Sequence, residues 1–403
     1  MGLSIASFNL RNYNFDANKP SPDAFKKEKL ARLVKIFGDG CFDIIVLQEV
    51  QTPETVNSIV RALNNGSPFG KFRGIHCFSF YEEISEGRLK SPDREKRGEL
   101  AYIWNSEKLS LYKGEAVYRR LNDRLWLALD YFVNSVSSVL SVALAAGMFL
   151  PEKDSDDVAD RKQRKRKTAR KTVQGLATAG VAGAGFMAHK IVDAQLKRMR
   201  PPFVVFFHPK DGARVDKTRQ IRLVNVHSQF GKVDGADWFA TPTQIRQAEA
   251  EFVLRDVFQS VKSECADEGV DNPAAYVLAC GDFNRSLGKL SEIAHDINKA
   301  VPRKTDEMKI AVGIRKEDVT DVQKDRARTT IAVVNRDEVK KGKQRKYDYS
   351  HDYDHFAFDM DVWRVSDAKR GLDLTSKEFF VFDGPERRAI SDHLPISIVS
   401  EKL

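Results

Sequence analysis

Short apolar runs bounded by turn-forming residues recur along this 403-residue chain, and patterns typical of helices lie between them. The runs predict β-strands at 3–9, 43–48, 99–104, 203–208, 221–227, 276–281, 355–359 and 396–399. Apolar residues at helical spacing predict helices over 22–37, 55–63 and 243–262. Some strands alternate with helices and others follow one another directly. This order favours a layered α/β fold on mixed sheets over a purely parallel one.

The composition is typical of a globular protein with a sizeable core, since 42% of the residues are hydrophobic and 31% are charged. Four cysteines are too few and too scattered for a disulfide framework or a zinc site, so we expect them to be reduced. The N-terminus has no basic region or cleavage site of a secretory signal. Ala6 breaks the myristoylation pattern that Gly2 begins. These features predict a cytoplasmic protein.

Residues 122–198 interrupt the alternation of strands and helices. The segments 131–150 and 172–189 contain no charged residue, and between them the run RKQRKRKTARK has eight basic residues in eleven. We expect a helical hairpin inserted into an α/β domain made of 1–121 and 199–403. Each arm has the roughly 20 residues that cross a bilayer. The hairpin therefore either packs on itself or a partner, or contacts a membrane through 131–189.

The net charge of +9 is concentrated in the same region. Residues 151–200 hold 13 Lys and Arg against 6 Asp and Glu, so the rest of the chain is close to neutral. The basic run is either a solvated loop or a contact for nucleic acid or anionic lipid. The overall charge alone is therefore weak support for nucleic-acid binding.

Acidic or amide side chains stand at the ends of five predicted strands: Asn9 in SFNLR, Glu49 in IIVLQEV, Asp282 and Asn284 in GDFN, Asp354 in YDHFAFD, and Asp392 in SDHLPI. Side chains from separate strand ends can converge outside a sheet. Oxygen ligands of this kind suit Mg²⁺, Mn²⁺ or Ca²⁺. A single strand-end carboxylate is more often a turn former than a ligand. Five in one chain indicate a metal site.

Two histidines share this setting, because His227 ends the strand 221–227 and His393 follows Asp392. An imidazole exchanges protons near neutral pH, and a neighbouring carboxylate fixes its tautomer and raises its pKa. Alone, His227 would more often be a structural histidine. Together with the strand-end carboxylates, the two histidines indicate acid–base catalysis beside a metal.

The motifs SIASFNLRNY, IIVLQEV, GELAYIW, RPPFVVFF, LVNVHSQF, GDFN, YDHFAFD and SDHLPI follow one another in an order that resembles the endonuclease/exonuclease/phosphatase superfamily. The resemblance covers about 1–120 and 199–403. Within the superfamily the chain looks most like the DNase I branch, because of FNLR, the Glu before AYIW, the Arg-Pro-Pro before FVVFF and the His after LVN. The resemblance implies an α/β four-layer sandwich of two mixed β-sheets flanked by helices.

The resemblance also implies a Mg²⁺-dependent DNA endonuclease of low sequence specificity, with Mn²⁺ or Ca²⁺ as alternative ions. Glu99 would orient His227, and Asp354 would orient His393. One imidazole would deprotonate the attacking water and the other would protonate the leaving 3′-oxygen, in an order that stays open. Two arginines would bind backbone phosphates. The implied metal ligands are Glu49, Asn9, Asp282, Asn284 and Asp392, and the implied phosphate-binding residues are Arg11 and Arg200.

The alternative is a membrane-associated phosphodiesterase acting on phosphoinositides, sphingomyelin or another lipid. Sphingomyelinase-like members also carry His at the position of His227, and the apolar hairpin would supply a membrane contact. A binding module without catalysis is disfavoured, because every expected catalytic position is filled. A non-specific nuclease without a leader would endanger its own cytosol, so we also expect an inhibitor or a regulatory partner.

Overall fold

The computed structural model describes residues 2–18, 23–65, 70–77, 99–112, 202–228, 242–263, 274–299, 308–311, 329–334, 336–359, 365–370, 379–382 and 387–400. The chain divides into one unit of 1–118, 200–230 and 246–403 and a second of 119–199 and 231–245. The predicted hairpin at 122–198 and Arg200 lie outside the described residues. The domain boundaries therefore stay a prediction.

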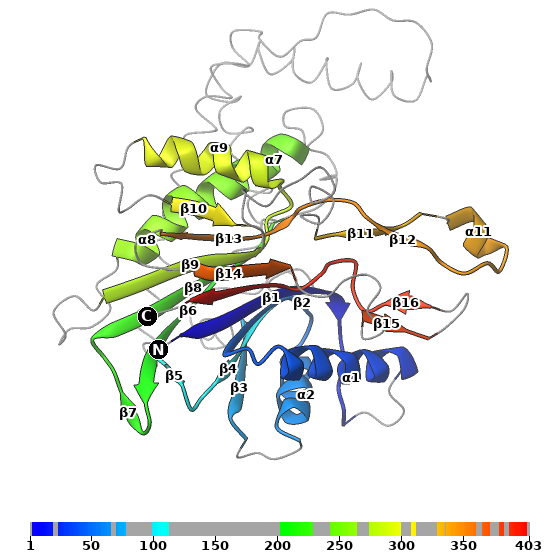
Figure 1. Ribbon diagram of the computed structural model, residues 1–403, viewed down its shortest axis with the longest axis horizontal. Helices are drawn as coiled ribbons and strands as arrows, with labels where there is room; N and C mark the ends of the chain where they lie inside the picture. The colour runs from blue at the N-terminus through cyan, green and yellow to red at the C-terminus, as the bar shows by residue number, and fades with distance from the viewer. Residues whose placement is uncertain are drawn as a thin grey trace, which may run out of the picture. The chain divides into compact units, whose positions relative to one another are not determined.

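Two mixed sheets form the centre of the first unit (Figure 1). The first sheet has the strand order β14 (Val365–Arg370), β17 (Ile396–Ser400), β1 (Leu3–Tyr13), β2 (Ile44–Val50), β4 (Leu100–Asn105) and β3 (Phe72–His76). The second has the order β10 (Met308–Ala311), β13 (Asp354–Asp359), β9 (Ala274–Asp282), β8 (Arg219–His227), β6 (Phe203–Asp211) and β5 (Leu109–Leu111), with β7 (Arg214–Val215) paired to β6.

Each sheet has one parallel pair of strands near its middle. In the first sheet β1 runs parallel to β2, and in the second β8 runs parallel to β9. The neighbours β17 and β13 are antiparallel to β1 and β9, respectively. As a result, the carboxyl ends of the parallel strands and the beginnings of β17 and β13 lie at the same edge of their sheets.

The alternation of side chains along β1 explains how the layers pack. Leu3 and Ile5 point to the core between the two sheets, where they join Leu223 of β8 and Leu278 of β9. Phe8 and Leu10 belong to a second core between the first sheet and its helices. Both faces of β1 are thus buried, which accounts for apolar residues on both sides of the strand.

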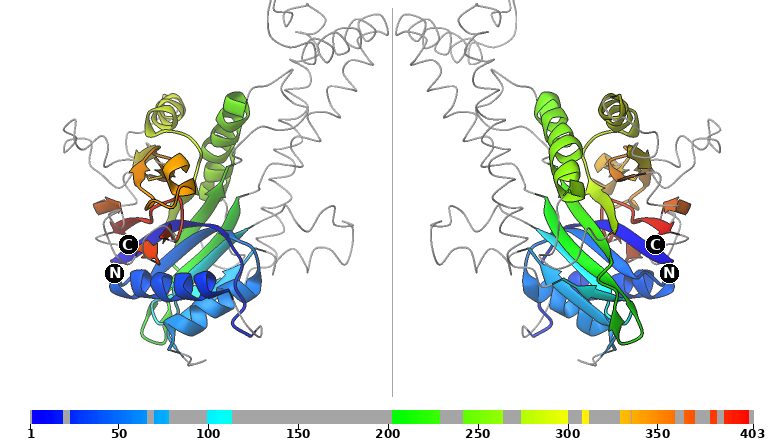
Figure 2. Two further views of the ribbon diagram at one scale, coloured as in Figure 1. Left: turned by 90° about the vertical axis from the view of Figure 1, so that its right-hand side faces the viewer. Right: turned by 90° about the vertical axis from the view of Figure 1, so that its left-hand side faces the viewer.

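Helices cover the outer faces of the two sheets (Figures 1 and 2). On the first sheet lie α1 (Ala24–Asp39) and α2 (Pro53–Leu63). On the second lie α7 (Pro242–Glu251), the π-helical segment η1 (Phe252–Val257), α8 (Phe258–Ser263) and α9 (Leu287–Asn298). Asp23 caps α1 by accepting hydrogen bonds from the backbone amides of Phe25 and Lys26. The layer order of helices, sheet, sheet and helices confirms the predicted fold class.

Two small hairpins extend beside the sheets. One joins β11 (Ile331–Val333) to β12 (Tyr347–Tyr349) through the short helix α11 (Arg336–Lys340), and the other pairs β15 (Phe380–Val381) with β16 (Arg388–Ala389). None of the described helices has the length and hydropathy needed to cross a membrane. The apolar segments at 131–189 are not among them.

Candidate active site

The candidate active site lies where the carboxyl ends of the two central parallel pairs meet. Asn9 is the last residue of the continuous parallel register of β1, opposite Gln48, and Glu49 lies near the end of β2. His227 and Asp282 are the last residues of β8 and β9 and are direct partners in the register. Because β13 is antiparallel to β9, its first residue, Asp354, pairs with Asp282. Sheet topology thus collects side chains that are far apart in the sequence.

The amide of Asn9 brings two carboxylates together. Its Nδ2 donates to Glu49 Oε1 at 3.0 Å and to Asp282 Oδ2 at 3.2 Å. The other carboxylate oxygen of Glu49, Oε2, accepts the backbone N–H of Asn12 at 2.8 Å. Asp282 is buried, and the Glu49 side chain is only 16% exposed. Two acidic groups from different sheets therefore face each other in a place with little access to water.

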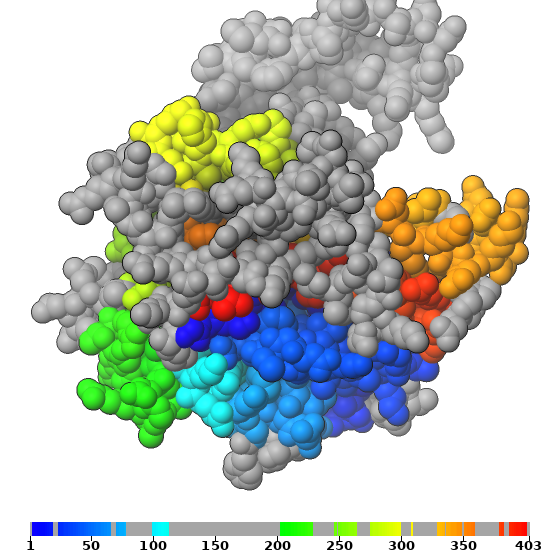
Figure 3. Space-filling view, viewed as in Figure 1, coloured from blue at the N-terminus to red at the C-terminus, as the bar shows by residue number. Residues whose placement is uncertain are grey.

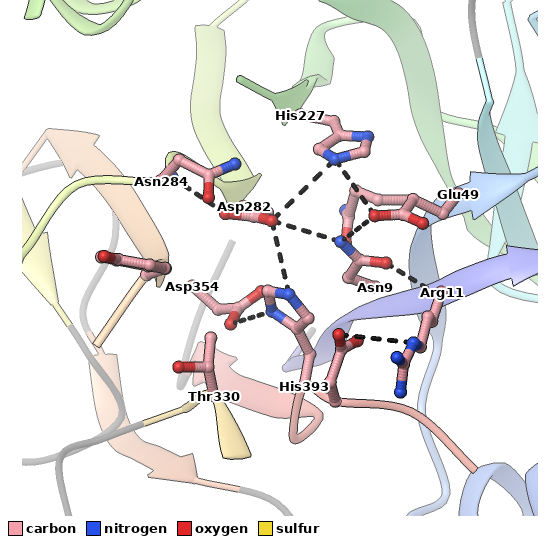
Figure 4. A network of polar contacts seen from close by, with 12 residues as sticks. Asn9, Arg11, Glu49, His227, Asp282, Asn284, Thr330, Asp354 and His393 are labelled. Atoms are coloured by element: carbon pink, nitrogen blue, oxygen red, sulfur yellow. Dashed lines mark hydrogen bonds and ion pairs between the residues drawn. The ribbon is translucent and has the colours of Figure 1, made fainter. Parts of the chain in front are cut away.

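Two imidazoles lie on either side of Asp282 (Figure 4). Nε2 of His227 is 3.9 Å from Asp282 Oδ2 and 3.4 Å from Glu49 Oε1. Nε2 of His393 is 3.6 Å from the same Asp282 oxygen. Nδ1 of His393 donates to Asp354 Oδ2 at 2.8 Å, which orients the ring and leaves Nε2 facing the site. The predicted pairing of Asp354 with His393 is present.

The charges in this cluster are strongly interdependent. Burial by itself lowers the pKa of His393, but the carboxylates of Asp354 and Asp282 outweigh it and raise the pKa to about 10. Burial raises the pKa of Asp282, and the nearby positive charge of His393 opposes that effect. A carboxylate buried at this point is stabilised by cations, whether imidazolium or metal.

The backbone around the site adopts the left-handed conformation at residues other than glycine. Glu49 has φ 56° and Asn284 has φ 49°, while Arg11 and Asn12 have φ 53° and 49°. For residues other than Gly, Asn and Asp this conformation costs about 1 kcal/mol or more. Glu49 adopts the left-handed conformation, and its carboxylate accepts the hydrogen bond from Asn9. Local strain and the position of the carboxylate are therefore linked.

A buried polar layer lies directly beneath the site and was not predicted from the sequence. Gln48 Nε2 donates to Asn225 Oδ1 at 2.8 Å, across the interface between the sheets. Asn225 Nδ2 in turn donates to the carbonyls of Leu47 at 2.9 Å and Ala101 at 3.2 Å. Asn225 lies two residues before His227 and so points to the same face of β8. This layer joins the strands that carry the site.

The remaining predicted residues lie at its margin. Arg11 Nε forms an ion pair with Asp392 Oδ2 at 3.4 Å, so these two side chains contact each other beside the cluster. Asn284 donates its backbone N–H to Asp282 Oδ1 at 2.9 Å and its side-chain amide to the Ser228 carbonyl at 2.7 Å. Glu99 immediately precedes β4, and its backbone carbonyl accepts from Val50 at 3.0 Å. Its pairing with His227 stays a prediction.

Other residues that support the site were also missed from the sequence. The hydroxyl of Ser391 donates to the Asn9 carbonyl at 2.7 Å and accepts from the backbone N–H of His393 at 3.1 Å. Lys29 is buried, and its ammonium donates to the Leu10 carbonyl beside the Tyr13 ring. Serines and lysines are common everywhere in the chain, so neither residue gives a signal in the sequence.

The donor set fits a hard divalent cation. Glu49 and Asp282 supply carboxylate oxygens from facing strand ends. Ligand atoms of Asp282, Asp354 and His393 also lie within 4.8 Å of one another, so they form a second set of potential ligands. Oxygen-rich sets with one or two carboxylates suit Mg²⁺, which keeps part of its water shell. Asp282 belongs to both sets, so the two sets adjoin.

No protein-family model matches the chain, and no curated protein matches it. Solved structures do. An endonuclease/exonuclease/phosphatase family protein from Bacteroides thetaiotaomicron covers 99% of this chain and 97% of its own at 12% identity, with a TM-score of 0.44. A mannosyl-6-phosphatase from the same organism covers 98% of both chains at 13% identity, with a TM-score of 0.43. The human Nocturnin catalytic domain covers 99% of this chain and 93% of its own at 12% identity, with a TM-score of 0.39.

The likeness is to the endonuclease/exonuclease/phosphatase proteins. At identities of 13% or less and TM-scores below 0.5, the function proposed below rests on the geometry of the site itself.

Proposed function

We propose that this chain hydrolyses phosphodiester bonds of DNA with a divalent metal ion, Mg²⁺ by preference, and two imidazoles as acid and base. One observation carries the proposal: Nε2 of His227 and Nε2 of His393 lie 3.9 and 3.6 Å from the same carboxylate oxygen of Asp282. A phosphate placed beside Asp282 would have one imidazole on the side of the attacking water and one on the side of the leaving oxygen. Phosphodiester hydrolysis requires proton transfer at both places.

The proton transfers balance with the two histidines alone. One imidazole takes a proton from water as its oxygen bonds to phosphorus. The other gives a proton to the 3′-oxygen as the bond between that oxygen and phosphorus breaks. Asp354 holds His393 in the required orientation through the 2.8 Å hydrogen bond, and we propose the same role for Glu99 toward His227.

The ligands proposed for the metal are Glu49 and Asp282 in the first place, with Asn9, Asn284 and Asp392 around them. When bound there, a divalent ion would offset the negative charge that builds up on the phosphoryl oxygens. Arg11 and Arg200 are proposed to hold backbone phosphates, a role that suits the guanidinium group. The proposed substrate, DNA, follows from the resemblance of these positions to the DNase I branch.

A panel of substrates tests the proposal. Supercoiled plasmid, sphingomyelin vesicles and phosphoinositide vesicles are each incubated with the protein in Mg²⁺, in excess EDTA, and in EDTA followed by restored Mg²⁺. We expect plasmid nicking that EDTA abolishes and Mg²⁺ restores. Release of lipid products without nicking would contradict the choice of DNA. Nicking that persists after exhaustive chelation would contradict the metal requirement.

A modified substrate shows which of the two histidines is the general acid and which is the general base. An oligonucleotide with sulfur in place of the bridging 3′-oxygen has a leaving group that needs no protonation. The variant that lacks the general acid should therefore cut this substrate almost as fast as the wild type, while the variant that lacks the base should stay slow. His227→Ala and His393→Ala are compared in this way. Equal defects on both substrates in both variants would contradict the division into acid and base.

A further inference from the structure

A cavity of about 510 Å³ lies next to the candidate active site. It is enclosed by the end of β1, by α1, and by the two small hairpins β11–β12 and β15–β16. Ser391 and Asp392 line it and also contact the catalytic cluster, through Asn9 and Arg11 respectively. The cavity therefore adjoins the place where the scissile phosphate would lie. Its volume is within the range of pockets that hold small ligands.

The polar lining of this cavity is mostly cationic. Four arginines line it: Arg11 of β1, Arg336 of α11, Arg345 in the connection between α11 and β12, and Arg388 of β16. Asp392 is the one carboxylate among its lining residues, and Arg11 is the arginine that pairs with it, at 3.4 Å. Within the described part of the chain, neither Arg336 nor Arg345 forms an ion pair. The lining residues thus carry more guanidinium groups than carboxylates.

The rest of the wall is apolar and partly aromatic. Phe25, Ile331, Val333, Tyr347 and Ile390 contribute to it. Arg388 lies over the Phe25 ring, with its guanidinium carbon 5.6 Å from the ring centroid, and the Tyr347 hydroxyl donates to the Arg387 carbonyl at 3.1 Å. On the right of Figure 3, the orange-red surface of the β15–β16 hairpin lies next to the orange surface of β11–β12. A ligand here would meet guanidinium groups on one side and an apolar wall on another.

We infer that this cavity is a subsite for one nucleotide of the bound strand, which takes a phosphate neighbouring the scissile one on Arg336, Arg345 and Arg388. Guanidinium groups recognise phosphate oxygens through paired hydrogen bonds. The apolar wall is suited to the sugar and base of the same nucleotide. The inference rests on the proposed function, because it takes the substrate to be a phosphate polymer. It adds the residues that would hold the strand outside the reacting bond.

Binding without turnover tests the inference. A short fluorescein-labelled single-stranded oligonucleotide is titrated with the protein in EDTA, and its anisotropy is followed over a salt series. The double variant Arg336→Gln/Arg345→Gln is compared with Arg214→Gln/Lys217→Gln, which removes the same charge from exposed positions at β7. We expect the first pair to weaken binding at least about tenfold. We expect its salt slope to fall by about 0.7, as loss of one phosphate contact from a single strand predicts.

The matched control should bind within about twofold of the wild type. An equal loss of affinity in both double variants would overturn the subsite and leave only a general effect of net charge. Unchanged affinity of Arg336→Gln/Arg345→Gln would overturn it as well. Near-ultraviolet circular dichroism and thermal unfolding establish that both variants are folded, and Arg388→Gln, tested alone, should show the same direction of change.

Inorganic phosphate, used as a competitor, separates two sources of the anion. The inference requires the oligonucleotide to bind at least about a hundredfold more tightly than inorganic phosphate, because the apolar wall and further phosphates also contribute. Equal affinity, lost in the same double variant, would show a site for a free anion and would overturn the nucleotide assignment. Because EDTA prevents turnover, binding to the subsite can be confirmed even if the proposed nuclease activity is not found.

Discussion

Gln48 of the first sheet donates a hydrogen bond to Asn225 of the second at 2.8 Å, and both side chains are fully buried. The contact links the strands that end in Glu49 and His227. Asn225 also donates to the backbone carbonyls of Leu47 and Ala101, so this one side chain of the second sheet binds two strands of the first, β2 and β4. Buried hydrogen bonds of this kind fix how two sheets are aligned, because sliding the sheets would break them in a place without water.

We expect Asn225→Leu to lower the free energy of unfolding by about 3 kcal/mol, because three buried hydrogen bonds, to Gln48 and to the Leu47 and Ala101 carbonyls, are lost together. Chemical denaturation with urea measures this. Gln48→Leu combined with Asn225→Leu should recover part of the loss, since removing both partners leaves fewer orphaned groups. A single variant as stable as the wild type would show that the layer is not structurally important.

Three substitutions at the site should abolish most of the proposed nuclease activity. Glu49→Ala, His227→Ala and His393→Ala each remove a proposed metal ligand or proton-transfer group, and each should reduce plasmid nicking by at least about 100-fold. The exposed His295 on α9 provides the control, and His295→Ala should cut at the wild-type rate. Activity within about threefold of wild type in a folded variant would refute the role of that residue.

The stability of the protein should depend on the titration of Lys29. Burial lowers the pKa of Lys29 from 10.5 to about 7, although the Asp392 carboxylate opposes the effect. Between pH 7 and 10.5 the unfolded chain therefore binds a proton at this residue that the folded chain does not. The contribution of Lys29 to stability consequently rises with pH in this window, by up to about 1.4 kcal/mol per pH unit.

Lys29→Met removes that dependence, so the wild type should gain stability relative to the variant as the pH is raised from 7 toward 10. Urea unfolding at several pH values measures the difference. Lys27→Met, an exposed position on the same helix, serves as the control and should follow the wild type at every pH. Parallel curves for the wild type and Lys29→Met would contradict the prediction.

Gly281 is required where β9 approaches β8. Its φ is 138°, and a Cβ added there would lie 2.0 Å from the Val226 carbonyl oxygen. Gly281→Ala must push apart the strands that carry His227 and Asp282, so we expect a loss of about 3 kcal/mol or more and loss of nicking. Gly288, in α9, has no atom within 4 Å of such a Cβ. Gly288→Ala should instead raise stability by about 0.5–1 kcal/mol. Thermal unfolding of both variants decides the point.

The central strands could be predicted from the sequence because burial on both faces gives them continuous apolar runs. The run at 203–208 is the start of β6 (Phe203–Asp211), and the run at 221–227 lies within β8 (Arg219–His227). Edge strands were missed. β14 (Val365–Arg370) reads VSDAKR and β3 (Phe72–His76) reads FRGIH, and neither has the apolar alternation of a half-buried strand. A strand with one free edge needs less apolar surface, so its sequence is less distinctive.

Some residues of the candidate site could likewise be predicted from the sequence, and others could not. Asn9, Asp282 and His393 could be found because each follows or precedes a strong strand within a short motif. The convergence of Asn9 and Asp282, 273 positions apart, depends on which strands are neighbours, and periodicity does not give that information. Gln48, Asn225 and Ser391 act through contacts between distant segments. Nothing in their local sequence distinguishes them from ordinary polar residues.

The left-handed backbone at Glu49 affects which substitutions would raise the thermal stability of this protein. A laboratory selection for heat resistance alone would favour glycine at this position, because glycine adopts a φ of 56° without steric cost. The same replacement would remove a carboxylate from the facing strand ends. Thermal stability and the proposed catalysis therefore favour different residues at position 49. A library designed for heat resistance should keep Glu49 unchanged.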